Sequence, residues 1–146
     1  MWSDTFLLYE RAHLQRLLLW GVTSAVCGLV LLAVTRRTRP PLRSSLLFHF
    51  GFQTAAWGLI DLVLAGNAWR ALALRDLQSA TQLDRFLWLN VGLDVGYIAT
   101  GATLAAVAWL LGRRAGGIGA GIAIVTQGVG LLVLDARFLS LIDRFV

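Results

Sequence analysis

The stretch SLLFHFGFQTAAWGLIDLVLAG (45–66) is apolar along most of its length but carries two strongly polar side chains, Gln53 and Asp61. About 20 apolar residues are enough to cross the hydrocarbon core of a bilayer. Lipid offers the backbone no water to bond with, so such a segment forms a helix, whose peptide groups bond to one another. The stretch therefore predicts a transmembrane helix with two embedded polar groups.

The same apolar character is found in three further segments: residues 17–34, 86–111 and 118–142. The connection RRTRPPLRSS (36–45) contains two prolines and the connection GRRAGG (112–117) contains three glycines. Both kinds of residue interrupt helices. The sequence thus predicts a single domain, residues 1–146, of the all-α integral membrane class, built as a bundle of four transmembrane helices.

The composition is that of a membrane protein. Of the 146 residues, 58% are hydrophobic and 14% are charged, whereas soluble domains usually have about 25% charged residues. All 13 basic residues are arginine, which excludes a lysine Schiff base, and the single cysteine, Cys27, excludes a disulfide within one chain. The arginines flank apolar segments, so we expect membrane lipid headgroups as their partners and no nucleic acid.

The segment WRALALRDLQSATQLDR (69–85), between the second and third apolar stretches, mixes apolar and charged residues. Such a mixture is typical of an amphipathic helix that lies in the membrane interface. We therefore predict an interfacial helix between the second and third transmembrane helices.

The placement of arginine indicates the orientation. The short connections 36–45 and 112–117 contain six arginines and no acidic residue, whereas the other arginines are spread over longer segments that also contain acids. Short arginine-rich loops tend to stay in the cytoplasm. The prediction is a protein of the bacterial cytoplasmic (inner) membrane, with these loops cytoplasmic and both termini outside.

The pair Gln53 and Asp61 recurs as Gln127 and Asp135 in the fourth apolar segment, again eight residues apart. Residues at i, i+4 and i+8 share one face of a helix. The recurrence suggests two repeated helical hairpins related by a pseudo-twofold axis along the membrane normal. Coincidence is the alternative, because these are the only identities when the second and fourth helices are overlaid.

A rise of about 1.5 Å per residue places the embedded polar groups in two layers. The layer nearer the termini is a polar cluster of seven residues: Asp61, Asp94, Asp135, Asn90, Tyr97, Arg16 and His13. Gln53 and Gln127 lie about 12 Å deeper. Charges are costly in lipid, so we expect the aspartates to face the bundle interior, with Arg16 as their counter-charge. The cluster either couples to protons or cations, forms a polar substrate pocket, or fixes the helix register as a static network.

Glycines spaced by four residues occur in GLDVG (92–96) and GIGAG (117–121). This spacing permits close approach of helix backbones, either within one chain or between copies. It predicts four helix-packing glycines: Gly92, Gly96, Gly117 and Gly121.

Catalytic motifs are missing from the sequence. There is no HExxH, GxSxG or phosphate-binding loop, so we predict no catalytic residue and no enzyme. His13 and His49 lie near opposite ends of the predicted bundle, which argues against bis-histidine ligation of one haem within the chain. We predict no metal site and no cofactor, and leave open a lipid, a quinone or a partner-bound pigment.

Three function classes remain, and the third, a membrane enzyme that acts on a lipid or quinone, has the least support because no nucleophile–base pair or metal set can be assembled from the sequence. The first is a non-enzymatic accessory or structural subunit that packs against a larger membrane complex, in contact with other subunits or with copies of itself. The alternative is a small homo-oligomeric transporter, coupled to protons or ions, that uses the intramembrane aspartates. Polar residues thin out between the glutamine layer and the arginine-rich loops, and for this reason the sequence favours the accessory subunit.

Overall fold

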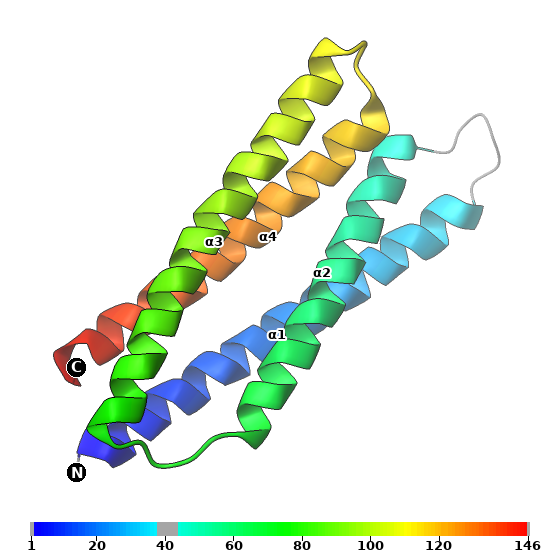
Figure 1. Cartoon of the computed structure of the whole chain (residues 1–146). Helices are drawn as coiled ribbons and strands as arrows, with labels where there is room; N and C mark the ends of the chain where they lie inside the picture. The colour runs from blue at the N-terminus through cyan, green and yellow to red at the C-terminus, as the bar shows by residue number, and fades with distance from the viewer. Residues whose placement is uncertain (1, 38–43, 146) are drawn as a thin grey trace.

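The computed structural model describes residues 2–37 and 44–145, and this part of the chain is helical without strands (Figure 1). The helices are α1 (Trp2–Arg37), α2 (Ser45–Arg70), α3 (Leu77–Leu110), α4 (Ala115–Ile142) and the short 3-10 helix η1 (Asp143–Phe145). The four α-helices are long and apolar enough to cross a membrane. The predicted all-α fold with four long apolar helices is confirmed. The proline-containing connection, residues 38–43, lies outside the described residues.

The prediction of a separate interfacial helix at residues 69–85 is wrong. α2 continues to Arg70, the connection covers only residues 71–76, and α3 begins at Leu77. Most of the segment therefore belongs to α3 and runs along the bundle.

Capping and burial explain why α3 begins early. The Asp76 carboxylate accepts a hydrogen bond of 2.8 Å from the backbone N–H of Ser79 and another from its hydroxyl. These bonds satisfy a donor in the first turn, which stabilises the helix end, and they lower the pKa of the Asp76 carboxyl, so the cap is ionised at neutral pH. Ala80 and Leu87 are buried, so the first turns of α3 pack against protein.

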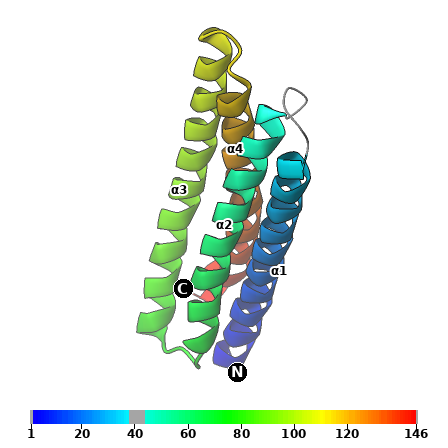
Figure 2. The same cartoon turned by 90° about the vertical axis from the view of Figure 1, so that its right-hand side faces the viewer.

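The bundle consists of two hairpins. α1 packs along α2, and α3 packs along α4, while α4 also contacts α2 and, over a shorter stretch, α1. α2 and α3 make almost no close contact, and they stand apart in Figure 1. Figure 2 shows the same bundle turned by 90°. A twofold axis that exchanged the hairpins would map the α1–α4 contact onto α2–α3. The structure makes only the first of these two contacts, so any such symmetry is incomplete.

The two ends of the bundle differ in packing. At the end that carries both chain termini (the terminal end), a buried apolar cluster joins α1, α3 and α4: Phe6, Ala80, Leu87, Phe138, Leu139 and Ile142. At the opposite end, where α1 connects to α2 and α3 to α4 (the loop end), small residues bring the backbones together. A Cβ built on Gly119 would overlap the carbonyl group of Leu46, so the two hairpins touch there.

The predicted packing glycines fall into two groups. A Cβ on Gly121 would lie 2.5 Å from the carbonyl oxygen of Gly101. A Cβ on Gly117 would lie 2.7 Å from the Cβ of Ala108. Both glycines therefore lie in the α3–α4 contact. Gly92 and Gly96 are exposed and have no neighbouring atom within 4 Å of such a Cβ, so among the described residues they pack against nothing. Packing between copies stays a prediction.

The difference between Gly121 and Gly96 is testable. Gly121→Ala forces α3 and α4 apart, so we expect the free energy of unfolding to fall by about 1–3 kcal/mol. Gly96→Ala adds a methyl group to an open helix face and should change it by less than about 1 kcal/mol. Thermal unfolding of the purified protein in mild detergent measures both, and equal midpoints for the two variants would contradict the packing described here.

Candidate functional site

A cavity of about 500 Å³ lies between the four helices in the terminal half of the bundle. Its walls come from residues 10–17 of α1, 57–68 of α2, 83–97 of α3 and 131–138 of α4, together with Ala71 and Arg75 of the α2–α3 connection. Most of the lining residues belong to the terminal half of their helices, and Trp57, Asp94 and Tyr97 lie just beyond the midpoints of α2 and α3. A volume of this size is within the range of small-molecule binding sites.

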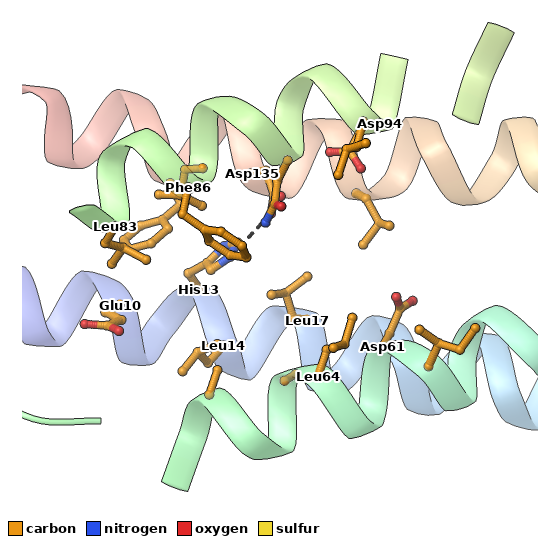
Figure 3. Close-up of a pocket in the computed structure, with 18 of the residues that line it drawn as sticks. Glu10, His13, Leu14, Leu17, Asp61, Leu64, Leu83, Phe86, Asp94 and Asp135 are labelled. Atoms are coloured by element: carbon orange, nitrogen blue, oxygen red, sulfur yellow. Dashed lines mark ion pairs between the residues drawn. The ribbon is translucent and has the colours of Figure 1, made fainter. Parts of the chain in front are cut away.

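The three aspartates of the predicted cluster line this cavity from three different helices. Asp61 comes from α2, Asp94 from α3 and Asp135 from α4, and each is buried. Figure 3 shows Asp61 rising from α2 toward the opposite wall, which carries Asp94 and Asp135. Asp94 is close enough to the other two for their charges to repel when ionised.

The spacing of buried residues along α3 explains how Asp94 reaches the interior. The buried positions of this helix are seven residues apart: Ala80, Leu87, Asp94, Gly101 and Ala108. Seven residues make nearly two helical turns, so these side chains form one narrow stripe along the helix. The stripe faces α4 and the cavity, and most of the remaining surface of α3 is turned away from the bundle.

Asp61, on the α1–α2 hairpin, accepts a hydrogen bond from a residue of the α3–α4 hairpin. The side-chain amide of Gln127, on α4, donates a hydrogen bond to Oδ2 of Asp61, and both side chains are buried. Gln127 therefore satisfies part of the hydrogen-bonding capacity of the Asp61 carboxylate and links the α1–α2 hairpin to α4. Gln53, which the sequence pairs with Gln127, is half-buried and does not line the cavity.

Asp135 faces α1 and α3. Its Oδ1 lies 3.4 Å from Nε2 of His13, and the side chain of Asn90 lies close to the same carboxylate. The imidazole of His13 is stacked on the ring of Phe138, with 4.4 Å between ring centroids and an interplanar angle of 14°. Figure 3 shows the ring of His13 pointing toward Asp135, with their contact drawn as a dashed line.

Asp94 differs from the other two aspartates. Only 3% of its surface is exposed, and its Oδ2 has no hydrogen-bond partner among the described residues. A buried carboxylate oxygen without a partner is costly. The cavity therefore contains one polar group that the residues of the structure do not satisfy.

An ion pair lies where the cavity approaches the terminal end. The guanidinium of Arg75 donates to both carboxylate oxygens of Glu10, over 2.8 and 2.6 Å. Ser3 donates a further hydrogen bond of 3.0 Å to the carbonyl oxygen of Arg75. The hydrogen bond to Glu10 raises the pKa of Arg75, which keeps the guanidinium charged. The pair fastens the α2–α3 connection to α1.

This ion pair predicts a stability effect. Arg75→Ala leaves the buried Glu10 carboxylate without its partner, so we expect the free energy of unfolding to fall by about 1–3 kcal/mol. Arg70→Ala, at an exposed position at the end of α2, is the matched control and should have little effect. Thermal unfolding in mild detergent distinguishes the two, and a wild-type midpoint for Arg75→Ala would show that the pair does not stabilise the fold.

Of the other predicted site residues, some line the cavity and one does not. Tyr97 and Asn90 line the cavity, and the Tyr97 ring packs on Trp57 with 4.9 Å between centroids. Arg16 is half-buried and does not line the cavity, so the basic group next to the aspartates is His13. Within residues 2–37 and 44–145, no group of three or more His, Cys, Asp or Glu residues is arranged to hold a metal ion.

Sequence reasoning missed Glu10 and Arg75. Glu10 precedes the first apolar segment, and Arg75 was assigned to the interfacial helix, so neither was expected beside the cavity. The only available signal was that both are charged residues close to the predicted membrane boundary, which does not indicate a contact between them.

Comparison with known proteins gives one match. Residues 16–136 match a family described as a family of unknown function, DUF6992. The chain belongs to this family. The matched region contains the three aspartates and Gln127, while Glu10 and His13 precede it. No curated protein and no solved structure is detectably similar to the chain.

Proposed function

We propose that this chain is an integral membrane protein that acts as a small carrier coupled to protons or cations, with the cavity as its binding site. The observation that supports this most is the convergence of three buried carboxylates on one cavity, with an oxygen of Asp94 left without a partner. A network that served only to fix helix register would be expected to satisfy each of its buried members, because an unsatisfied group lowers stability.

The exterior of the bundle supports membrane insertion. Large apolar side chains on all four helices are exposed, among them Leu19 at 68%, Val63 at 63%, Leu110 at 80% and Val133 at 61%. Water would disfavour an exterior of this kind, whereas lipid tails accept it. With 14% charged residues, the chain has too few charges to cover this surface.

We place the chain in the bacterial cytoplasmic membrane with both termini outside, because the arginine-rich connections favour the cytoplasm. In spheroplasts of a strain that produces the Cys27→Ser protein, a membrane-impermeant maleimide should label Asp143→Cys. It should label Ala115→Cys only after the membrane is permeabilised. The reverse labelling pattern would overturn this orientation and place the cavity on the cytoplasmic side.

The packing supports a carrier whose cavity is open to one side of the membrane at a time. The cavity extends from the terminal end to about the middle of the bundle, while the helices are joined at the loop end by contacts such as Gly119 with Leu46. Each hairpin is tightly packed internally, and the contacts between hairpins are made mainly by α4. Rocking of one rigid hairpin against the other is therefore the simplest motion that would open the loop end. The Gln127–Asp61 hydrogen bond joins the hairpins and would have to change during this motion.

If the chain is a carrier coupled to protons, it should allow protons to cross the membrane. In proteoliposomes with an internal pH dye, a clamped membrane potential and an inward proton gradient, the wild-type protein should acidify the interior faster than protein-free liposomes do. Asp94→Asn keeps the side-chain shape but cannot take up and release a proton, so it should return the rate to that of protein-free liposomes. Asp143→Asn, an exposed residue outside the cavity, should retain the wild-type rate.

The accessory subunit is the second candidate, and the outer face of α3 supports it. Gly92 and Gly96 are exposed there next to Trp88, which is 58% exposed. Small residues beside an aromatic side chain form a surface on which another transmembrane helix can pack. If the wild-type protein carries no proton flux and co-purifies from native membranes with larger stoichiometric partners, the carrier proposal fails and the accessory subunit takes its place. A particle that contains only copies of this chain would count against the accessory subunit.

A further inference from the structure

We infer that the cavity binds an organic cation with an apolar body, which enters sideways between α2 and α3 and places its positive charge beside Asp61 and Asp94. This inference rests on the proposed function and narrows it, because it names the class of ligand. Two observations support it besides the acidic residues themselves: the cavity is large enough for a small molecule, and the buried side chain of Asp94, which lines it, has an oxygen without a partner among the described residues.

The lining residues include more acidic groups than permanently charged basic groups. Among them, Arg75 is neutralised by Glu10, and His13 lies against Asp135 with a ring that is charged only when protonated. Asp61 and Asp94, on the α2 and α3 walls, have no basic side chain within salt-bridge distance in the described part of the chain. Buried carboxylates require a proton or a counter-charge. A cation in the cavity would supply that charge.

The remaining walls favour an organic ion over an inorganic one. Next to the two aspartates lie the aromatic rings of Trp57 and Tyr97, and most of the other lining side chains are aliphatic or aromatic. Aromatic faces attract organic cations, and apolar walls favour a ligand with an apolar body. A small metal ion needs several oxygen ligands close together, and the described residues contain no group of three or more His, Cys, Asp or Glu side chains arranged to hold one.

The exposed lining residues indicate the route of entry. Leu64 on α2 is 62% exposed and Phe86 on α3 is 55% exposed, and both line the cavity. The lining residues of α1 and α4 are buried or half-buried. Since α2 and α3 make almost no close contact, the cavity reaches the outside between these two helices. A ligand dissolved in the lipid would reach it from the side.

The α1–α4 side of the bundle shows how the chain satisfies a comparable carboxylate. There a ring nitrogen of His13 faces Asp135, and the ring is stacked on Phe138. On the α2–α3 side, Asp61 and Asp94 face the cavity beside Trp57 and Tyr97. A nitrogen- or phosphorus-centred cation with an apolar body would bring a positive charge and an apolar surface to that side.

Two ions of the same shape and opposite charge test this inference. Tetraphenylphosphonium and tetraphenylborate are incubated with the full-length protein in nanodiscs of zwitterionic lipid, and empty nanodiscs correct for partition into lipid. We expect saturable binding of one tetraphenylphosphonium per chain and no saturable binding of tetraphenylborate. Equal binding of the two ions, or no binding of tetraphenylphosphonium above that of empty nanodiscs, overturns the inference.

Variants then locate the site. Asp94→Asn and Asp61→Asn should each weaken tetraphenylphosphonium binding at least about tenfold, because each removes a charge close to the bound cation. Asp143→Asn should bind as the wild-type protein does. Wild-type affinity in both cavity variants would overturn the inference even if the cation binds elsewhere on the protein.

A rim variant tests the route without changing a buried residue. Leu64→Trp enlarges an exposed side chain at the opening and should slow or weaken binding. Leu59→Trp, at a 52% exposed position of α2 that does not line the cavity, is its control. Equal effects of the two variants would contradict entry between α2 and α3.

The results of the binding experiment and of the proton-flux experiment can be told apart. Binding of tetraphenylphosphonium without proton flux would leave the cation site in place and remove only the carrier. Proton flux that depends on Asp94, in a protein that does not bind the cation, would support the carrier and overturn the cation site.

Discussion

Gly28 and Gly121 bring helix backbones into direct contact, because a side chain at either position would overlap the backbone of the neighbouring helix. Contacts of this kind recur within both hairpins, at Gly51 and Gly58 in one and at Gly101 in the other. They make each hairpin a closely packed pair. α4 has room on its other faces to contact α2 and α1, whereas α3 is buried along a single stripe. The open side between α2 and α3, and with it the cavity, follows from this uneven packing.

The same packing determines how the three aspartates are satisfied. Asp135 faces the closed α1–α4 side and has His13 and Asn90 as neighbours. Asp61 reaches one amide, that of Gln127. Asp94 lies on the helix that has fewest neighbours, and one of its oxygens has no partner among the described residues. Of the three cavity aspartates, the least satisfied one therefore lies on the side where α2 and α3 stand apart.

Individual residues show how far the sequence could predict the site. The depth of Asp61, Asp94 and Asp135 along their segments follows from counting residues at a constant helical rise, and the three line one cavity in the structure. Arg16 was expected beside them at the same depth, but it does not line the cavity, and His13 lies against Asp135. Depth alone does not specify the direction in which a side chain points around the helix axis.

The segment at 69–85 was misinterpreted for a related reason. Its mixture of charged and apolar residues is compatible with a surface helix, and only contacts with distant residues show otherwise. Ala80 and Leu87 pack in a cluster with Phe6 and Phe138, and Arg75 bonds to Glu10. By itself, the sequence determined four long apolar helices and the levels of their polar groups, because both depend on local composition and helical rise. The tertiary structure decided which helices touch, which carboxylate lacks a partner and where the cavity opens, because these depend on helix rotation and on contacts between segments far apart in the chain.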